Sequence, residues 1–228
     1  MKIIGLIGGT TWVSTQEYYR IINETVNKKL GKSHSARCIL YSVDFEETII
    51  KQMNNWDKLA NDLVIIAKKL EKSGADVVLI CANTLHKVFE DIEKNISIPV
   101  IHIADVTGKK IVQKGIKKVG LLGTKITMRE KFYKDRLKSK FDVDTIVPEK
   151  DDIDFIHHVI IDEIAHEKYK KSSKKKYIKI IDDLVLKGAE GIILGCTEIP
   201  LLISQKDIDV PVFDTTSIHA KAAVDYIL

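Results

Sequence analysis

The sequence predicts an α/β protein made of two similar halves, and three observations lead to this fold class. Short apolar runs alternate with longer runs of helical periodicity along the whole chain of 228 residues. The short runs are almost continuously apolar, which is typical of parallel strands buried on both faces. Several sequence landmarks also recur at a nearly constant spacing. We therefore expect largely parallel sheets with functional residues at the carboxyl ends of the strands.

The expected elements alternate in chain order, because each short apolar run is followed by a turn and then by a longer amphipathic run. The runs that predict strands are residues 3–7, 36–42, 75–80, 99–103, 118–122, 143–147, 191–194 and 210–213. The runs that predict helices are residues 14–30, 56–73, 107–114, 127–140, 152–166, 172–187 and 216–228.

An internal repeat divides the chain into halves. Three landmarks recur in the same order: residues 5–8 as 120–123, residues 74–76 as 188–190, and residues 98–100 as 210–212. We infer two homologous halves of about 114 residues, whose equivalent strand ends face each other across a cleft. The expected domains are residues 1–105 plus 213–228, and residues 106–212.

Composition excludes several classes of protein. Hydrophobic residues make up 45% and charged residues 30%, which excludes a disordered or collagen-like chain. No apolar stretch is long enough to span a membrane. Three cysteines without a Cys-x-x-Cys spacing fit neither a disulfide framework nor a zinc site. We expect a soluble protein of the cytoplasm, without a metal.

The net charge of +4 comes from one lysine-rich segment, residues 168–176. A local run of this kind is usually a solvated helix face, and no nucleic-acid-binding module surrounds it. Neither a nucleic acid nor a membrane is expected as a partner.

The loop at residues 8–11, Gly-Gly-Thr-Thr, lies between an expected strand and an expected helix. Backbone N–H groups and the helix dipole attract an anion at such a place, either a carboxylate or a phosphate. The loop matches neither the dinucleotide-binding pattern nor the Walker A pattern, so nucleotide binding is not expected.

Two cysteine-containing turns carry the strongest chemical signal. Cys81 and Cys196 each end a buried strand, one in each half, and enter a turn rich in hydroxyl and amide groups. Two thiols that meet across a cleft allow one to remove a proton while the other delivers one, as inversion of a carbon centre requires. Cys38 has the surroundings of a core residue. His86 and His219 leave open a thiol hydrolase with a histidine base.

Several motifs together resemble the aspartate/glutamate racemase family of cofactor-independent amino-acid racemases, over nearly the whole chain. They lie at residues 8–20, 42–45, 83–86, 122–128, 195–200 and 214–220. The resemblance implies two subdomains with parallel four-stranded sheets related by a pseudo-twofold axis, an active site in the cleft between them, no pyridoxal phosphate, and a homodimer. The substrate that the resemblance implies is an acidic amino acid, with aspartate preferred to glutamate as the expected substrate.

The resemblance also implies roles for single residues. Cys81 and Cys196 would be the opposed acid and base, and Lys168 would pair with a substrate carboxylate. The remaining candidates for binding the substrate are the hydroxyl and amide neighbours Thr10, Thr11, Asn83, Thr84, Thr124 and Thr197.

One position departs from the family pattern. The first cysteine of the family directly precedes Asn-Thr, where this chain has Ala82 and carries Cys81 one residue earlier. In an extended backbone, a shift of one residue turns a side chain to the opposite face, so Cys81 lies either in the cleft or in the core. Two alternatives to a racemase follow: a decarboxylase or cis/trans isomerase of small dicarboxylic acids that uses Cys196 alone, or a non-catalytic binder of acidic amino acids.

Overall fold

The computed structural model describes residues 1–228, which divide into two compact units. Unit 1 consists of Met1–His102 and Thr216–Leu228, and unit 2 of Ile103–Thr215. The chain thus passes from unit 1 to unit 2 after His102 and returns after Thr215. Each unit contains one parallel sheet with helices packed against it, so the predicted α/β fold class is confirmed.

Unit 1 has a three-stranded sheet in the order β2-β1-β3, formed by β1 (Ile3–Gly8), β2 (Arg37–Ser42) and β3 (Val77–Ile80). The expectation of four strands in each sheet is wrong for this unit, because the strand expected at residues 99–103 is reduced to a single bridge between Val78 and Val100. Two features account for this. Pro99 has no N–H to donate to a neighbouring strand, and the next helix already begins at Ile103.

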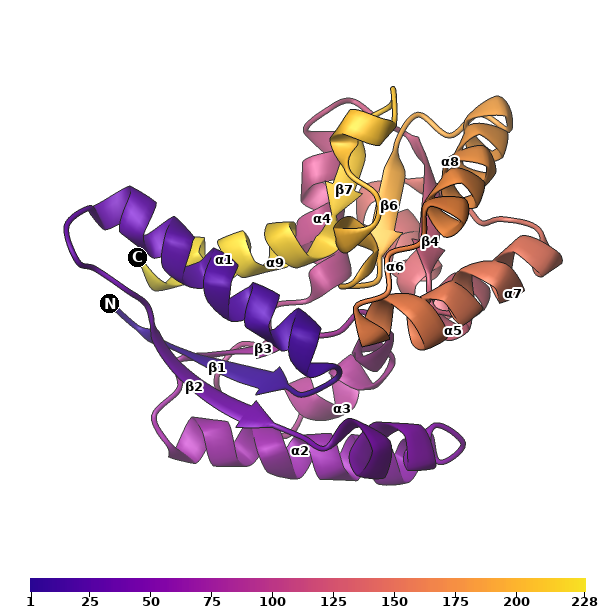
Figure 1. The fold of residues 1–228 in the computed structure, drawn as a ribbon. Coiled ribbons are helices and arrows are strands. Elements are labelled where there is room, and N and C mark those ends of the chain that lie inside the picture. The colour runs from indigo at the N-terminus through magenta and orange to yellow at the C-terminus, as the bar shows by residue number, and fades with distance from the viewer. The chain divides into compact units, whose positions relative to one another are not determined.

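Helices cover both faces of the unit 1 sheet (Figure 1). Helix α2 packs its apolar side on one face, and α1 and α9 pack on the other. The helices of this unit are α1 (Trp12–Leu30), α2 (Trp56–Lys72), α3 (Phe89–Glu93) and α9 (Thr215–Ile227). Helix α1 begins where the side chain of Thr11 accepts a hydrogen bond from the backbone N–H of Ser14, a standard N-cap.

Unit 2 has a four-stranded sheet in the order β5-β4-β6-β7. Its strands are β4 (Lys118–Gly123), β5 (Asp144–Ile146), β6 (Ile192–Gly195) and β7 (Val212–Asp214). Its helices are α4 (Ile103–Val112), α5 (Lys125–Arg129), α6 (Lys131–Phe141), α7 (Lys150–His158) and α8 (Lys171–Leu186). The helix expected at residues 127–140 is interrupted at Glu130, whose backbone is extended.

The two units repeat the same plan, as the sequence repeat predicts. The order β2-β1-β3 in unit 1 corresponds to β5-β4-β6 in unit 2. Each unit also has a π-helical turn followed by a 3-10 turn ahead of its long helix. In unit 1 these turns are η1 (Phe45–Ile49) and η2 (Ile50–Gln52), and in unit 2 they are η4 (Val159–Glu163) and η5 (Ile164–His166). The unit 2 pair begins 114 residues after the unit 1 pair. The π turn interrupts the helix expected at residues 152–166 after His158.

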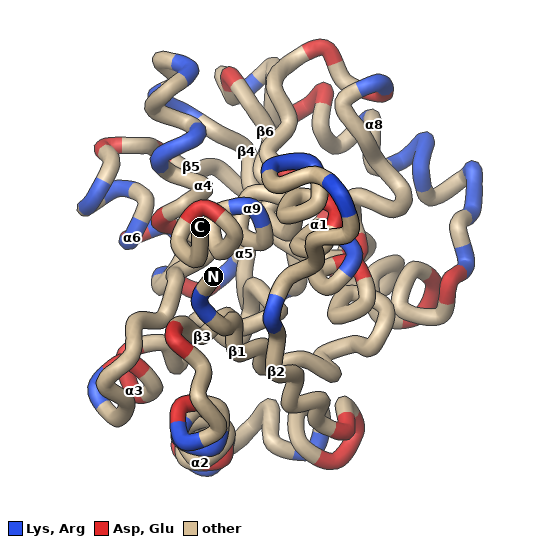
Figure 2. Tube along the Cα trace, turned by 90° about the vertical axis from the view of Figure 1, so that its left-hand side faces the viewer, with Lys and Arg blue, Asp and Glu red and all other residues tan.

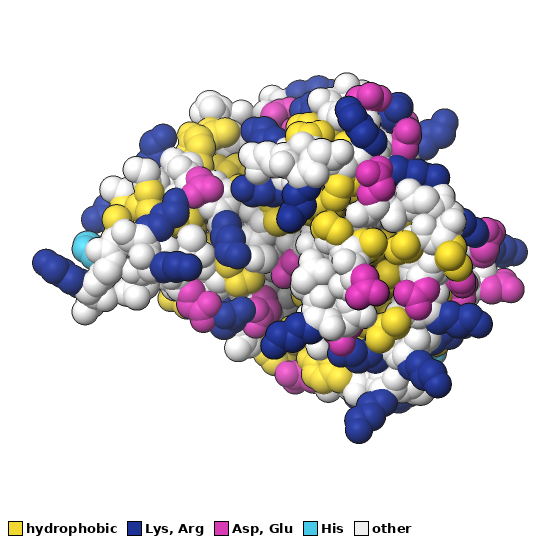
Figure 3. All heavy atoms as spheres, turned by 90° about the horizontal axis from the view of Figure 1, so that it is seen from above, with side chains coloured by type: hydrophobic (Ala, Val, Ile, Leu, Met, Phe, Trp, Pro, Cys, Tyr) yellow, Lys and Arg dark blue, Asp and Glu magenta, His cyan; other side chains and the backbone are white.

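Charged residues gather on the helices rather than on the strands. In Figure 2 the strands β3 and β6 carry no charged residue, whereas α2 carries both signs. The face in Figure 3 shows lysine and arginine side chains interspersed with aspartate and glutamate. None of the helices combines the length and the apolar character that a membrane span requires.

Candidate active site

In unit 1, two of the predicted segments lie at neighbouring strand ends. The loop of residues 8–11 follows β1, and the turn of residues 81–84 follows β3, its parallel neighbour. The hydroxyl of Thr10 donates to the backbone carbonyl of Cys81 at 3.2 Å, which ties the loop to the turn. Thr10 and Thr11 are both buried, and each is 8% exposed.

Gly9 makes the unit 1 loop possible. Its φ of +86° is a left-handed conformation that a side chain disfavours. A Cβ at this position would also lie 2.2 Å from the carbonyl oxygen of Val43. Glycine is therefore required for the close approach of this loop to the end of β2.

Cys81 lies in the interior of unit 1. Its side chain is 0% exposed and belongs to the apolar cluster on the α1 side of the sheet, together with Leu6 and Leu79. Burial raises the pKa of the Cys81 thiol far above its usual range. A thiol in these surroundings stays protonated and packs as a small apolar side chain.

Ala82 lies on the opposite face of the same sheet, in the cluster formed with α2. The imidazole Nδ1–H of His86 donates to its carbonyl oxygen at 2.7 Å, because a carbonyl can only accept. Asn83 and Thr84 follow in the turn, 3% and 8% exposed. This turn therefore presents a methyl group, an amide and a hydroxyl, none of which titrates near neutral pH.

In unit 2, Cys196 lies in the turn that follows β6 and is 6% exposed. Its Sγ donates a hydrogen bond to Oε2 of Glu198 at 2.9 Å, and the hydroxyl of Thr197 donates to the same oxygen at 2.8 Å. Burial, and then the Glu198 carboxylate, raise the pKa of Cys196 well above its usual range. The turn therefore holds a protonated thiol directly beside a carboxylate that can accept its proton.

Glu198 is a functional candidate that the sequence pattern did not single out. It lies within the predicted turn, but nothing in its sequence position shows that the carboxylate bends back onto Cys196. The available signal was its spacing of two residues from the cysteine in a turn, where a carboxylate can return to its own chain. Glu198 is 3% exposed, and a buried carboxylate calls for hydrogen-bond donors such as Cys196 and Thr197.

The strand register establishes which positions of the two turns correspond. Gly5 of β1 pairs with Val78 of β3, and the repeated Gly120 of β4 pairs with Ile192 of β6. Val78 therefore corresponds to Ile192, and four residues further on, Ala82 corresponds to Cys196. Cys81 corresponds to Gly195 and lies on the other face. Cluster membership agrees, since Ala82 packs with the α2 cluster and Cys196 with the matching α8 cluster.

The other two predicted residues belong to unit 2. Thr124 follows β4, the parallel neighbour of β6, and caps α5 by accepting the backbone N–H of Thr127. Lys168 lies in an exposed connection before α8, and its backbone N–H donates to the carbonyl of Glu163 at 2.9 Å. Thr124 therefore lies at the strand end next to that of Cys196, whereas Lys168 belongs to the connection that leads into α8.

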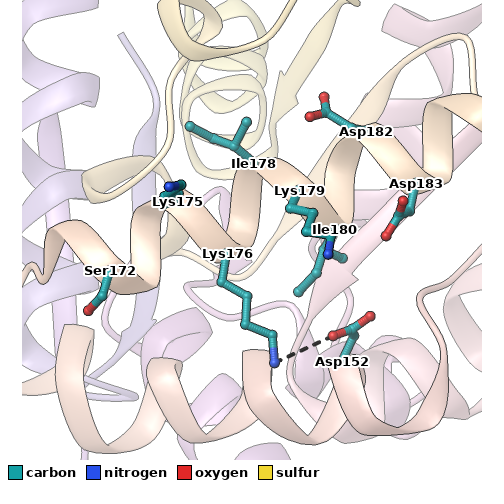
Figure 4. Close-up of a pocket in the computed structure, with 9 residues that line it drawn as sticks. All are labelled: Asp152, Ser172, Lys175, Lys176, Ile178, Lys179, Ile180, Asp182 and Asp183. Carbon is teal, nitrogen blue, oxygen red and sulfur yellow. Dashed lines mark ion pairs between the residues drawn. The ribbon is translucent and has the colours of Figure 1, made fainter.

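A surface groove of about 680 Å³ between α7 and α8 contains none of the predicted site residues (Figure 4). Its charged lining is balanced, with three lysines and three aspartates: Lys175, Lys176, Lys179, Asp152, Asp182 and Asp183. Lys176 pairs with Asp152 at 3.6 Å across the groove. This balance gives the groove no preference for a charged ligand.

Comparison with known proteins gives a consistent result. The family model of the Asp/Glu/Hydantoin racemases matches residues 7–223. The chain is 24% identical over 225 residues to the broad-specificity amino-acid racemase RacX of Bacillus subtilis, covering 97% of this chain and 96% of that protein.

Two solved structures cover 99% of this chain and 99% of their own. One is from Yersinia pestis, provisionally assigned as an Asp/Glu racemase, with 46% identity and a TM-score of 0.92. The other is PH1733, an aspartate racemase homologue from Pyrococcus horikoshii, with 36% identity and a TM-score of 0.88.

Proposed function

Because the chain belongs to the Asp/Glu/Hydantoin racemase family of isomerases, we propose that it interconverts L- and D-aspartate by exchanging the proton on Cα, without a cofactor. The observation that carries this proposal is the Cys196–Glu198 pair, a thiol and a carboxylate in hydrogen-bond contact at a strand end. Aspartate is favoured over glutamate because a 36% identical structure is named as an aspartate racemase homologue.

Cys196 is the proposed acid and base at Cα. At rest it is a thiol, since its pKa is raised by burial and by Glu198. To act as a base it passes its proton to the Glu198 carboxylate, and the resulting thiolate takes the proton from Cα. To act as an acid it delivers its proton to the carbanion. Glu198 thus stores the proton between the two steps, and proton transfer by a positioned group of this kind contributes a rate factor of about 10² to 10⁴.

The second proton transfer of a racemase needs a different donor here. The position that corresponds to Cys196 is Ala82, whose methyl group has no proton to exchange. We propose that water provides this second transfer: it donates a proton to the carbanion from the other side, and the hydroxide left behind takes up a proton from solvent. The proton held by Glu198 is released to solvent in turn, which restores the carboxylate. Cys81 has no part in this exchange. The hydroxyl and amide groups of Thr10, Thr11, Asn83, Thr84, Thr124 and Thr197, with Lys168, would bind the two substrate carboxylates.

The test is incubation of the pure protein with L-aspartate in D₂O, followed by chiral separation and mass spectrometry. Wild type is expected to produce D-aspartate with deuterium at Cα. A Cys196→Ala variant should lose about 10³-fold of this rate, the loss expected for a positioned acid and base. Cys196→Ser is the matched control, because its hydroxyl is similar in size but gives up its proton far less readily than a thiol, and it should lose activity as well. A protein that leaves both the enantiomer and the Cα hydrogen of aspartate and glutamate unchanged contradicts the proposal.

Ala82 also supports a second candidate, a decarboxylase or cis/trans isomerase of small dicarboxylic acids that needs only Cys196. Such an enzyme protonates a carbanion, or adds to a double bond, from one side only. Release of carbon dioxide from a dicarboxylic acid, or isomerisation of maleate, without racemisation of aspartate would favour it.

A further inference from the structure

Three buried imidazoles lie behind the turn of residues 82–84, and the proton transfers proposed above use none of them. His86, His102 and His219 are 2%, 5% and 0% exposed. The ring centroid of His86 lies 4.7 Å from that of His102 and 5.5 Å from that of His219. All three belong to unit 1. They therefore form one cluster of titratable side chains that is almost entirely shielded from bulk solvent.

Hydrogen bonds fix the tautomers of two members. A carbonyl oxygen only accepts, so His86 donates Nδ1–H to Ala82 at 2.7 Å, and His219 donates Nε2–H to Ile101 at 2.8 Å. The Nδ1 atom of neutral His219 then accepts from the hydroxyl of Tyr18 at 2.8 Å. Burial, reinforced by His86, lowers the pKa of His219 to about 3, so this ring is neutral at physiological pH.

The cluster lies where the chain leaves and re-enters unit 1. His102 is the last residue before the chain passes to unit 2, and His219 follows its return at Thr216 by three residues. The bond from His219 to the Ile101 carbonyl therefore joins the outgoing segment to the returning helix α9. Ring contacts with His102, His219 and Phe89 hold the imidazole of His86 against this joined region.

We propose that His86 is a positioning residue for the turn of residues 82–84. Its ring is fixed by the cluster, and its Nδ1–H fixes the Ala82 carbonyl, which sets the direction in which Asn83 and Thr84 are presented. The identity of the ligand that Asn83 and Thr84 bind, a substrate carboxylate, rests on the proposed function. The orientation of the turn does not depend on that function.

The matching turn of unit 2 supports this role by contrast. The strand register places Pro200 at the position of His86. There the Cys196 carbonyl accepts from the backbone N–H of Ile199 at 3.3 Å, and the proline ring restricts the backbone. The unit 1 turn also has a main-chain hydrogen bond, from the N–H of His86 to the carbonyl of Asn83 at 3.1 Å. The carbonyl of the first turn residue, however, is bound by the main chain in unit 2 and by the His86 side chain in unit 1.

Two variants of His86 separate positioning from bulk packing. His86→Asn places an amide N–H near the original Nδ1, whereas His86→Leu fills similar space without a donor. For Cα deuterium exchange of aspartate, His86→Leu should raise KM about fivefold, as expected from the loss of one hydrogen bond, and leave kcat within about twofold. His86→Asn should restore most of the KM. Equal KM values in wild type and His86→Leu overturn the proposal, as do equal effects of the two substitutions.

A second measurement needs no substrate. The amide chemical shifts of Asn83 and Thr84 should move in His86→Leu and return toward wild-type values in His86→Asn, in ¹⁵N–¹H spectra. Unchanged shifts in His86→Leu overturn the positioning role. If the shifts move as expected but aspartate is not turned over, the proposed function has failed and the positioning of the turn still stands.

Discussion

The turns at the ends of β3 and β6 have the same place in their units and different chemistry. In unit 2 the turn begins with Cys196 and continues to Glu198, which accepts its hydrogen bond. In unit 1 the same positions hold Ala82 and Thr84, with Asn83 between them. One copy of the repeat therefore contains a titratable pair, and the other contains only neutral groups.

This difference shows that the scaffold and the chemistry of a duplicated fold can change separately. The strand order, the strand register and the paired π and 3-10 turns are kept in both units. The side chains at the strand ends are not kept. Turns at strand ends can vary in sequence without disturbing the sheet that carries them, so each copy can take a different role. We interpret unit 2 as the source of proton transfer and unit 1 as a source of binding groups.

The largest gain in activity is expected from a substitution that makes the unit 1 turn resemble the unit 2 turn. Ala82→Cys places a thiol at the position of Cys196 in the repeat, and should raise the rate of aspartate racemisation about 10²-fold, the lower part of the range for a positioned acid and base. Chiral chromatography of initial rates measures the gain. Ala82→Ser is the matched control and should give no comparable gain. If Ala82→Cys leaves the rate unchanged while the protein stays folded, the equivalence of the two turns does not extend to their chemistry.

A smaller effect is expected from Glu198→Gln, which makes the unit 2 turn neutral like that of unit 1. The carboxylate helps to raise the pKa of Cys196, so its loss should lower that pKa and move the alkaline limb of the rate profile to lower pH. The rate at its optimum should fall about tenfold, because the proton store is lost. The pH dependence of kcat for racemisation measures both changes. An unshifted profile would mean that Glu198 only supports the turn structurally.

Much of this comparison was accessible from the sequence. The repeated glycine landmarks predicted two α/β halves, and the alternation of apolar and amphipathic runs located every strand that the sheets contain. The motifs around Cys196 and Asn83 also indicated the family. These features are encoded locally, since the period of the apolar pattern and the flanking turn residues determine them.

The remaining features depend on contacts that sequence spacing does not contain. The repeat offsets of 115, 114 and 112 left the match between the cysteines undecided, and only the pairing of Gly5 with Val78 and Gly120 with Ile192 decides it. The bond between Cys196 and Glu198 and the imidazole cluster behind Ala82 are tertiary contacts. Local propensity could not reveal them.

A further expected effect concerns stability alone and belongs only to unit 1. His219 in the unfolded chain binds a proton below about pH 6.5, whereas in the folded chain it stays neutral down to about pH 3. The unfolded state therefore binds more protons in this window, and stability falls as the pH falls, by up to about 1.4 kcal/mol for each pH unit. His219→Gln keeps a donor for the Ile101 carbonyl without the titration.

Comparing wild type with His219→Gln separates the contribution of His219 to the pH dependence of stability from that of the carboxylates, because the carboxylates titrate in both proteins. Urea unfolding at several pH values between 7 and 4 should show a steeper loss of stability for wild type than for His219→Gln. Parallel curves would show that His219 is protonated in the folded protein, or that its environment is more solvated than its 0% exposure indicates.

The smallest expected effect on activity is that of Cys81→Ala. Cys81 corresponds to Gly195 rather than to Cys196, and its side chain packs in the cluster on the α1 side of the sheet. Removing the sulfur leaves a small cavity and should cost about 1 kcal/mol of stability, with racemisation within about twofold of wild type. Thermal unfolding and initial rates measure the two quantities on one sample. A loss of racemisation as large as that of Cys196→Ala, with stability retained, would make Cys81 the second acid and base, and would show that a thiol on the core face of the sheet can reach the reacting carbon.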